Sequence, residues 1–217
     1  MKRRNLLKAT ATATTITGFG VASSTARGQT NARTQRIRNA RLKKARKEYE
    51  SSLRARVAVE AHGKNILQEL ANQGILEEAS TSKLPMQTLS EHGTGKIEGT
   101  KVFASEENEG RFTAHITVIM ETDDREVRLN VRPHVGHSHA IIKSPDETKI
   151  VDSSGDVGIA RRCQEDVTCF ECSCCTGELE CGSSQKNEQT KECCWSGSNP
   201  DNSTCDIIDR SCCYGTC

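Results

Sequence analysis

The chain has 217 residues and a formal net charge of +1, from 30 basic and 29 acidic residues. All 12 cysteines lie in the last 55 residues, where three basic residues stand against ten acidic ones. This segment has only seven large apolar side chains, too few to offset the entropy lost when it becomes ordered. Its composition therefore excludes an ordinary hydrophobic core and requires covalent or metal cross-links.

The first 26 residues resemble a twin-arginine export signal. Arg3 and Arg4 are followed by two leucines and Lys8, then by a mildly apolar stretch of Ala and Thr. Small residues at positions 24–26 suit cleavage by signal peptidase. The apolar stretch is a poor membrane anchor, so we expect a secreted protein without a transmembrane helix after signal removal. The alternative is the basic amphipathic N-terminus of a cytosolic protein.

Residues 27–78 form a strongly basic region, with ten basic and two acidic residues between positions 31 and 56. Apolar residues recur every three or four positions over residues 42–61, which predicts a helix, and a second helix should end near Gly74. This region could bind lipid headgroups or the acidic C-terminal segment, or it could simply present a solvated charged face. We expect no nucleic-acid partner, because the chain is exported and no aromatic residues interleave the charges.

Residues 79–98 are predicted to be a linker, and residues 99–158 an antiparallel meander. The acidic pair at positions 123 and 124 suggests a hairpin turn between two of its strands. Arg128, Asn130 and Arg132 alternate with apolar residues, which predicts a strand with one face in water. Strands are expected at residues 101–104, 111–121, 127–131, 139–143 and 148–152.

Histidines 134, 137 and 139 are the one cluster in the meander with metal-ligand spacing. His137 and His139 would share one strand face, and His115 could lie near them. No carboxylate is placed as a fourth ligand, so we predict no metal and no cofactor, with His137 and His139 as the weaker alternative. The sequence also contains no nucleophile elbow, phosphate loop or HExxH motif. We therefore do not predict an enzyme.

Residues 159–162 form a dibasic joint that ends in Arg161 and Arg162, directly before the first cysteine. Two arginines on an exposed joint between unlike domains are a candidate processing site. The alternative is a charged linker that is never cut. Cleavage there would release a peptide of about 55 residues.

Residues 163–217 are predicted to form a disulfide-rich, loop-rich module. Three vicinal cysteine pairs fit a framework in which neighbours bond to different partners, but the spacing does not reveal the pairing. A thiolate metal site is the alternative, and the oxidising exterior favours disulfides. The disulfide candidates are Cys163, Cys169, Cys172, Cys174, Cys175, Cys181, Cys193, Cys194, Cys205, Cys212, Cys213 and Cys217.

The chain is thus expected to be α+β, with N-terminal helices and a small antiparallel sheet followed by the cysteine module. The basic N-terminal region and the acidic tail predict a contact between them within the chain.

The export signal at Arg3 and Arg4, a middle domain at residues 32–158 and a cysteine tail ending at Cys217 resemble the layout of halocin C8-type precursors. In that family of haloarchaeal bacteriocins, a cysteine-rich C-terminal peptide is released as the toxin, and the N-terminal part has an immunity function. The resemblance implies an antimicrobial peptide that acts on competitor cells or their envelope, with the N-terminal region as pro-region or immunity-like partner. The alternative is an uncleaved, exported surface protein with a structural or metal-binding role.

Overall fold

The computed structural model describes residues 24–88, 98–107, 110–122, 124–170, 185–195 and 203–214. The predicted signal therefore lies almost entirely outside the described residues. The chain divides into two compact units, Met1–Thr34 and Gln35–Cys217. The described part of the first unit is the beginning of helix α1 (Ser24–Lys47). Within the described residues, no helix is long and apolar enough to cross a membrane.

Two further helices follow α1 in the second unit. The apolar periodicity predicts one unbroken helix over residues 42–61, and this is wrong because α1 ends at Lys47 and a new helix begins at Ser52. The second predicted helix, expected to end near Gly74, is present. Helix α2 (Ser52–His62) begins at Ser51, whose side-chain oxygen accepts a hydrogen bond from the Arg54 N–H. Such an N-cap satisfies one of the backbone donors left free at a helix start. Helix α3 (Lys64–Asn72) follows after Gly63. The short 3-10 helix η1 (Thr81–Lys83) comes next.

The meander is a six-stranded antiparallel sheet in which the strands follow one another in chain order. The β2–β3 hairpin is closed by a backbone hydrogen bond in which the Thr122 N–H donates to the Arg125 carbonyl at 2.8 Å. The last strand was not predicted, and it includes residues that were expected to belong to the dibasic joint. The strands are β1 (Gly99–Glu106), β2 (Phe112–Glu121), β3 (Glu126–Arg132), β4 (His137–Lys143), β5 (Thr148–Val151) and β6 (Val157–Ala160).

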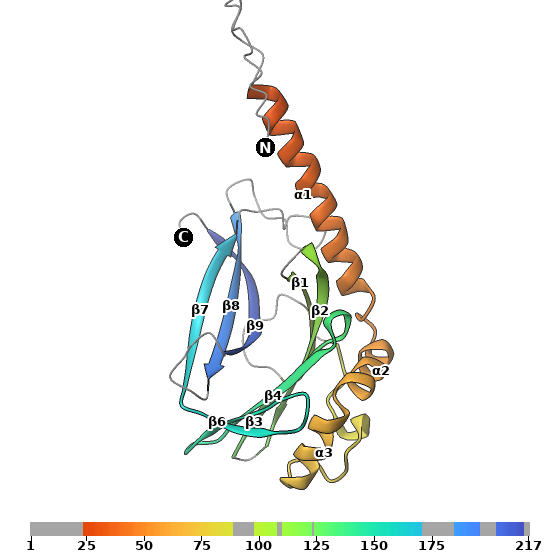
Figure 1. The fold of residues 1–217 in the computed structure, drawn as a ribbon, viewed down its shortest axis with the longest axis vertical. Helices are drawn as coiled ribbons and strands as arrows, with labels where there is room; N and C mark the ends of the chain where they lie inside the picture. Colours follow the sequence, from red (N-terminus) through yellow and green to blue (C-terminus); the bar gives the residue numbers. More distant parts are fainter. Residues whose placement is uncertain are drawn as a thin grey trace, which may run out of the picture. The chain divides into compact units, whose positions relative to one another are not determined.

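One face of this sheet packs against α2 and α3 and forms the apolar core (Figure 1). Val118, Leu129 and Ile142 from the sheet belong to the same buried cluster as Val59 and Leu70 from the helices. The cluster also contains Leu84 and Met86. Part of the expected linker therefore packs into the core, because it supplies apolar side chains that cover the sheet.

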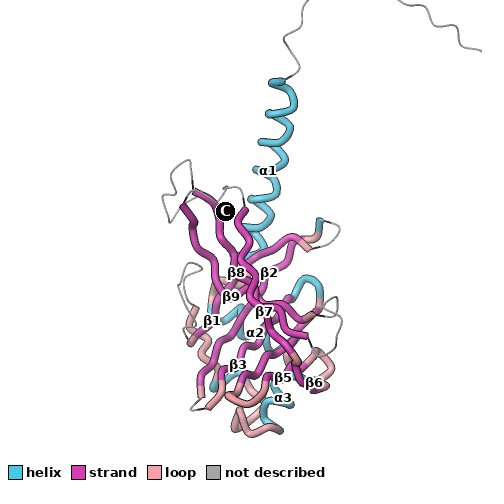
Figure 2. The backbone as a smooth tube through the Cα atoms, turned by 90° about the vertical axis from the view of Figure 1, so that its left-hand side faces the viewer, coloured by secondary structure: helices cyan, strands magenta, loops and turns pink. Residues whose placement is uncertain are grey.

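The cysteine module forms a second, three-stranded antiparallel sheet in the order β7-β8-β9. Its strands are β7 (Arg162–Phe170), β8 (Gln185–Trp195) and β9 (Thr204–Tyr214). Figure 2 shows these strands as continuous magenta segments. The α+β class is confirmed, and the described part of a module expected to be rich in loops consists mainly of strands.

The prediction that one face of the meander lies in water is wrong. Arg128 is 1% exposed and Asn130 is fully buried, although both point away from the apolar core. Residues of β8 and β9 contact this polar face. The six-stranded sheet is therefore covered on both sides, by helices on its apolar face and by the cysteine sheet on its polar face.

The apolar core generates the first testable prediction. Leu129→Ala should lower the free energy of unfolding by about 2–5 kcal/mol, because a fully buried side chain leaves a cavity. Leu53→Ala, at a position 70% exposed on α2, is the matched control and should change it by less than about 0.5 kcal/mol. Urea unfolding of the oxidised chain measures both, and equal effects would contradict the assignment of the core.

Candidate functional site: the charged interface between the two sheets

Alternation along the strands places a set of polar side chains on the face of the six-stranded sheet that points away from the helices. In β3, Val127, Leu129 and Val131 belong to the apolar core, so the residues between them face the other way. Asn130 lies opposite His139 of β4, and its side-chain amide donates to Thr117 Oγ1 at 2.9 Å. The register thus places Arg128 and His139 on one buried surface.

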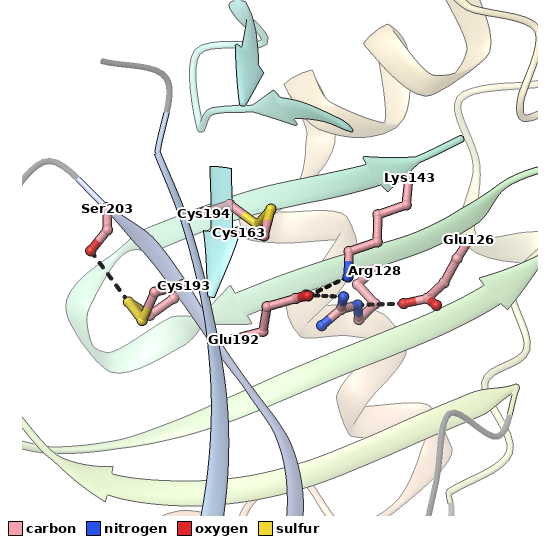
Figure 3. Close-up of a disulfide and its surroundings, with 9 residues drawn as sticks. Glu126, Arg128, Lys143, Cys163, Glu192, Cys193, Cys194 and Ser203 are labelled. Atoms are coloured by element: carbon pink, nitrogen blue, oxygen red, sulfur yellow. Dashed lines mark hydrogen bonds and ion pairs between the residues drawn. A yellow bond between two sulfur atoms is a disulfide. The ribbon is translucent and has the colours of Figure 1, made fainter. Parts of the chain in front are cut away.

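Glu192 of β8 is the centre of the strongest contact between the sheets. One of its carboxylate oxygens accepts from Arg128 Nη2 and the other accepts from Lys143 Nζ (Figure 3). Arg128 Nε also lies 2.7 Å from Glu126 Oε1. Glu192 is 3% exposed. Burial by itself raises the pKa of this carboxyl, but Lys143 and Arg128 outweigh burial and hold the pKa below its ordinary value.

Asp206 of β9 makes the second polar contact, with His139. The Asp206 Oδ1 atom lies 2.6 Å from His139 Nε2, and Asp206 is fully buried. Burial raises the pKa of Asp206, but the charge and the hydrogen bond of His139 outweigh it, so the pKa lies below its ordinary value. The second oxygen, Oδ2, has no hydrogen-bond partner among the described residues.

A third contact joins the edge strand β1 to β9. Lys101 Nζ donates to the backbone carbonyl of Ile208 at 3.3 Å, and Lys101 is 1% exposed. The six-stranded sheet thus presents cationic or imidazole groups from β1, β3 and β4, and the cysteine sheet presents acceptors from β8 and β9. These contacts place the acidic tail on the sheet, whereas the expected contact with the basic helices stays a prediction.

Two disulfides cross-link the cysteine sheet. Cys163–Cys194 joins β7 to β8, and Cys193–Cys205 joins β8 to β9. The vicinal cysteines 193 and 194 therefore bond to different partners, as predicted. These bonds indicate an oxidising environment such as the cell exterior.

The other cysteines are less informative. Five of them lie outside the described residues, and for three more only the backbone is described. The five are Cys172, Cys174, Cys175, Cys181 and Cys217, and the three are Cys169, Cys212 and Cys213.

The buried acids and one disulfide occupy consecutive positions of the same strand pair. Glu192 lies opposite Asp206, and Cys193 lies opposite Cys205. Sequence reasoning missed both acids as site residues. Their available signal was adjacency, since Glu192 directly precedes Cys193 and Asp206 directly follows Cys205.

The histidines singled out by their spacing do not form a metal site in the described part of the chain. The ring centroids of His137 and His139 lie 5.7 Å apart, so the two side chains lie close together, as expected. His139 Nε2, however, is engaged by Asp206, and His134 lies near Glu48 and Tyr49. Among the described residues, no three or more potential metal ligands cluster together.

Ser105, His115 and Glu107 form a second polar cluster that superficially resembles a catalytic triad. The hydroxyl of Ser105 lies 2.6 Å from His115 Nε2, and Glu107 Oε1 lies 3.3 Å from the same nitrogen. A triad requires the acid on the other ring nitrogen, and His115 Nδ1 has no partner among the described residues. The cluster therefore lacks the contact between acid and histidine that completes a Ser-His-Asp triad.

The dibasic joint is exposed at both arginines. Arg161 lies between the end of β6 and the first residue of β7, which is Arg162. The backbone N–H of Arg161 donates to the Trp195 carbonyl at 2.9 Å. The joint therefore connects the two sheets over a very short distance along the chain.

Comparison of the chain with protein-family models, curated proteins and solved structures gives no significant match.

The buried titratable groups generate a pH prediction. A hydrogen bond from His115 lowers the pKa of Glu107 to about 2, and burial lowers the pKa of His115 below 6.5. The pKa values of Glu192 and Asp206 are also lowered, from 4.5 and 3.8. In each case the folded chain binds fewer protons than the unfolded chain, so the free energy of unfolding must fall as the pH decreases.

The loss should begin as the pH falls below 6.5, where the unfolded histidine starts to take up protons, and steepen below 4.5, where unfolded carboxyls do so. Urea unfolding at pH 7, 5 and 3 measures it. Asp206→Asn should be less stable at pH 7 and should lose less stability between pH 5 and pH 3 than the unmodified chain. A free energy of unfolding that stays constant or rises toward pH 3 would contradict this account.

Proposed function

We propose that the chain is an exported precursor of a disulfide-stapled, cysteine-rich peptide of bacteriocin type, with the N-terminal region as pro-region or immunity-like partner. The observation that supports this best is how the cysteine sheet is attached. Both described disulfides lie inside residues 163–217, and the polar contacts between described side chains of this segment and the rest of the chain are noncovalent ion pairs and hydrogen bonds. Cleavage at Arg161 and Arg162 would leave these noncovalent contacts in place of the peptide link.

An interface built on buried charges suits a peptide that must be held and then released. The desolvation of Arg128 and Glu192 offsets much of their attraction, so such pairs specify an arrangement more than they stabilise it. The interface also contains apolar side chains, because Ile119 and Ile141 lie opposite Arg128 on the same buried face and Ile207 of β9 is buried. Its buried charges set the position of the peptide, and separation would return these charges to water.

Export and target complete the proposal. Arg3 and Arg4 would direct the chain to twin-arginine export, and the oxidising exterior would preserve the disulfides. The released peptide would act on competitor cells or their envelope. The same cationic face of the sheet could rebind the free peptide, which is the contact that an immunity-like role requires.

A second candidate is an exported surface protein whose cysteine sheet is never separated. The observation in its favour is the extent of burial at the interface, where Glu192, Asp206 and Arg128 are all almost inaccessible. The backbone bond from Arg161 to Trp195 also holds the joint against β8. In this reading the ion pairs orient a permanent domain.

The intact mass of the secreted protein separates the two candidates. We expect a species that begins near Cys163 and that takes up alkyl groups only after reduction. Arg161→Ala with Arg162→Ala should abolish that species, whereas the control Arg54→Ala with Arg56→Ala, at exposed positions of α2, should not. Secretion of the uncut chain alone, by a strain in which export is intact, would favour the permanent surface domain.

A further inference from the structure

The cysteines of the tail can pair in many different ways. Four cysteines already allow three pairings, and 12 allow on the order of ten thousand. The pairing depends on the register between strands, because a one-residue slip turns every side chain to the other face. The register of β8 and β9 shifts between Thr190 and Lys191, so one uniform pairing does not run along the two strands.

The native register is electrostatically unfavourable within the tail itself. It places Glu192 directly opposite Asp206, one position from the bond between Cys193 and Cys205. Like charges directly opposite each other destabilise an antiparallel pair. The tail has a net excess of seven acidic over basic residues, and the described contacts of these two acids are with cations and the imidazole of the other sheet.

The six-stranded sheet holds the two acids at fixed positions. Arg128 and Lys143 bind both oxygens of Glu192, while His139 binds Asp206. All three side chains project from the paired strands β3 and β4, so their spacing is set by the register of that sheet. An unoxidised tail that satisfies both contacts has β8 and β9 in native register, with Cys193 facing Cys205.

We propose that the polar face of the six-stranded sheet is a template that selects the disulfide pairing of the cysteine tail. The inference rests on the proposed pro-region role and gives that role a specific activity. By binding Glu192 and Asp206 side by side, the sheet brings the thiols of Cys193 and Cys205 together. The same alignment of β8 leaves Cys194 facing Cys163 of β7.

The chemical step is an ordinary thiol–disulfide exchange with a small-molecule disulfide as oxidant. The thiolate of one cysteine attacks the small disulfide and releases one small thiol. The thiolate of the other cysteine then attacks the mixed disulfide and releases the second. The protein pair loses two electrons and two protons, and the oxidant becomes two thiols. The template changes which pair forms and takes no part in the electron transfer.

Oxidative refolding of the uncut chain tests the template. The reduced, unfolded protein is refolded with oxidised and reduced glutathione, then cleaved at acidic residues under non-reducing conditions. Cuts that include Glu165 and Asp201 place Cys163, the vicinal pair and Cys205 on three peptides. Native pairing joins these three peptides in one product, and so does the swapped pairing of Cys163 with Cys193 and Cys194 with Cys205. Tandem mass spectrometry that breaks the backbone between Cys193 and Cys194 tells the two apart, and the ratio of the native product to all others is measured.

Arg128→Gln with Lys143→Gln should lower this ratio by about tenfold, the equivalent of about 1.4 kcal/mol. The matched control, Arg125→Gln with Lys149→Gln, removes two more exposed cations from the same sheet and should leave the ratio unchanged. Adding Glu192→Gln and Asp206→Asn to the first variant should restore the ratio in part, because the unopposed repulsion between the acids is removed.

Two results would overturn the template. A native ratio in Arg128→Gln with Lys143→Gln would mean that the tail encodes its own pairing. A ratio that stays low in the fourfold variant would mean that the first variant merely fails to form its sheet. Because the disulfide pairing is formed in the uncut chain before it is measured, these outcomes are independent of whether the peptide is released or kills cells.

Discussion

The carboxylate of Glu192, held between Arg128 and Lys143, is the contact on which the arrangement of the two sheets depends. It joins β8 to both β3 and β4, and the neighbouring pair of Asp206 and His139 fixes β9 to the same surface. Charged groups this deeply buried are tolerated only when they are paired and hydrogen-bonded. The interface is therefore selective, since a sheet that failed to present these acids in this order would leave uncompensated cations beneath it.

This constraint explains how a chain with few aromatic residues can bury a six-stranded sheet on both faces. The helix side is covered in the usual way, by aliphatic residues of α2 and α3. The other side combines buried aliphatic residues, such as Ile119 and Ile141, with ionic complementarity between a cationic surface and an acidic, disulfide-stapled one. The tail has too few apolar side chains for a conventional core. It can still cover the six-stranded sheet, because charged contacts attach it to that sheet and disulfides cross-link its own strands.

The sequence was sufficient for part of the local structure and insufficient for the interface. Apolar periodicity predicted α3 and the strands β1 to β5, because each of these elements has a core-facing side that repeats with the period of its own backbone. It merged the end of α1 with α2 and missed β6 and the strands of the cysteine sheet. The position of Arg128 between Val127 and Leu129 carries the same alternation, but alternation cannot distinguish a polar face in water from one beneath a second sheet. That distinction depends on Glu192, which lies 64 residues further along the chain. No sequence pattern near Arg128 indicates this partner.

The vicinal cysteines were more informative, because two adjacent residues of a strand point to opposite faces and must find different partners. The partners themselves depend on a register that includes a shift near Thr190. The buried histidine that a ligand-spacing argument selected, His139, proved to be the partner of a carboxylate. A histidine on a strand face serves either role, and only the opposing strand decides between them.

The bond between Cys163 and Cys194 has a consequence for the lifetime of a released peptide. A cut after Arg162 would make Cys163 the first residue, so the new amino terminus would be tied covalently to the middle strand of its sheet. Exopeptidases need several residues of free, extended chain to begin degradation. A peptide that starts at its own cross-link offers none at this end, and would resist degradation from its amino terminus.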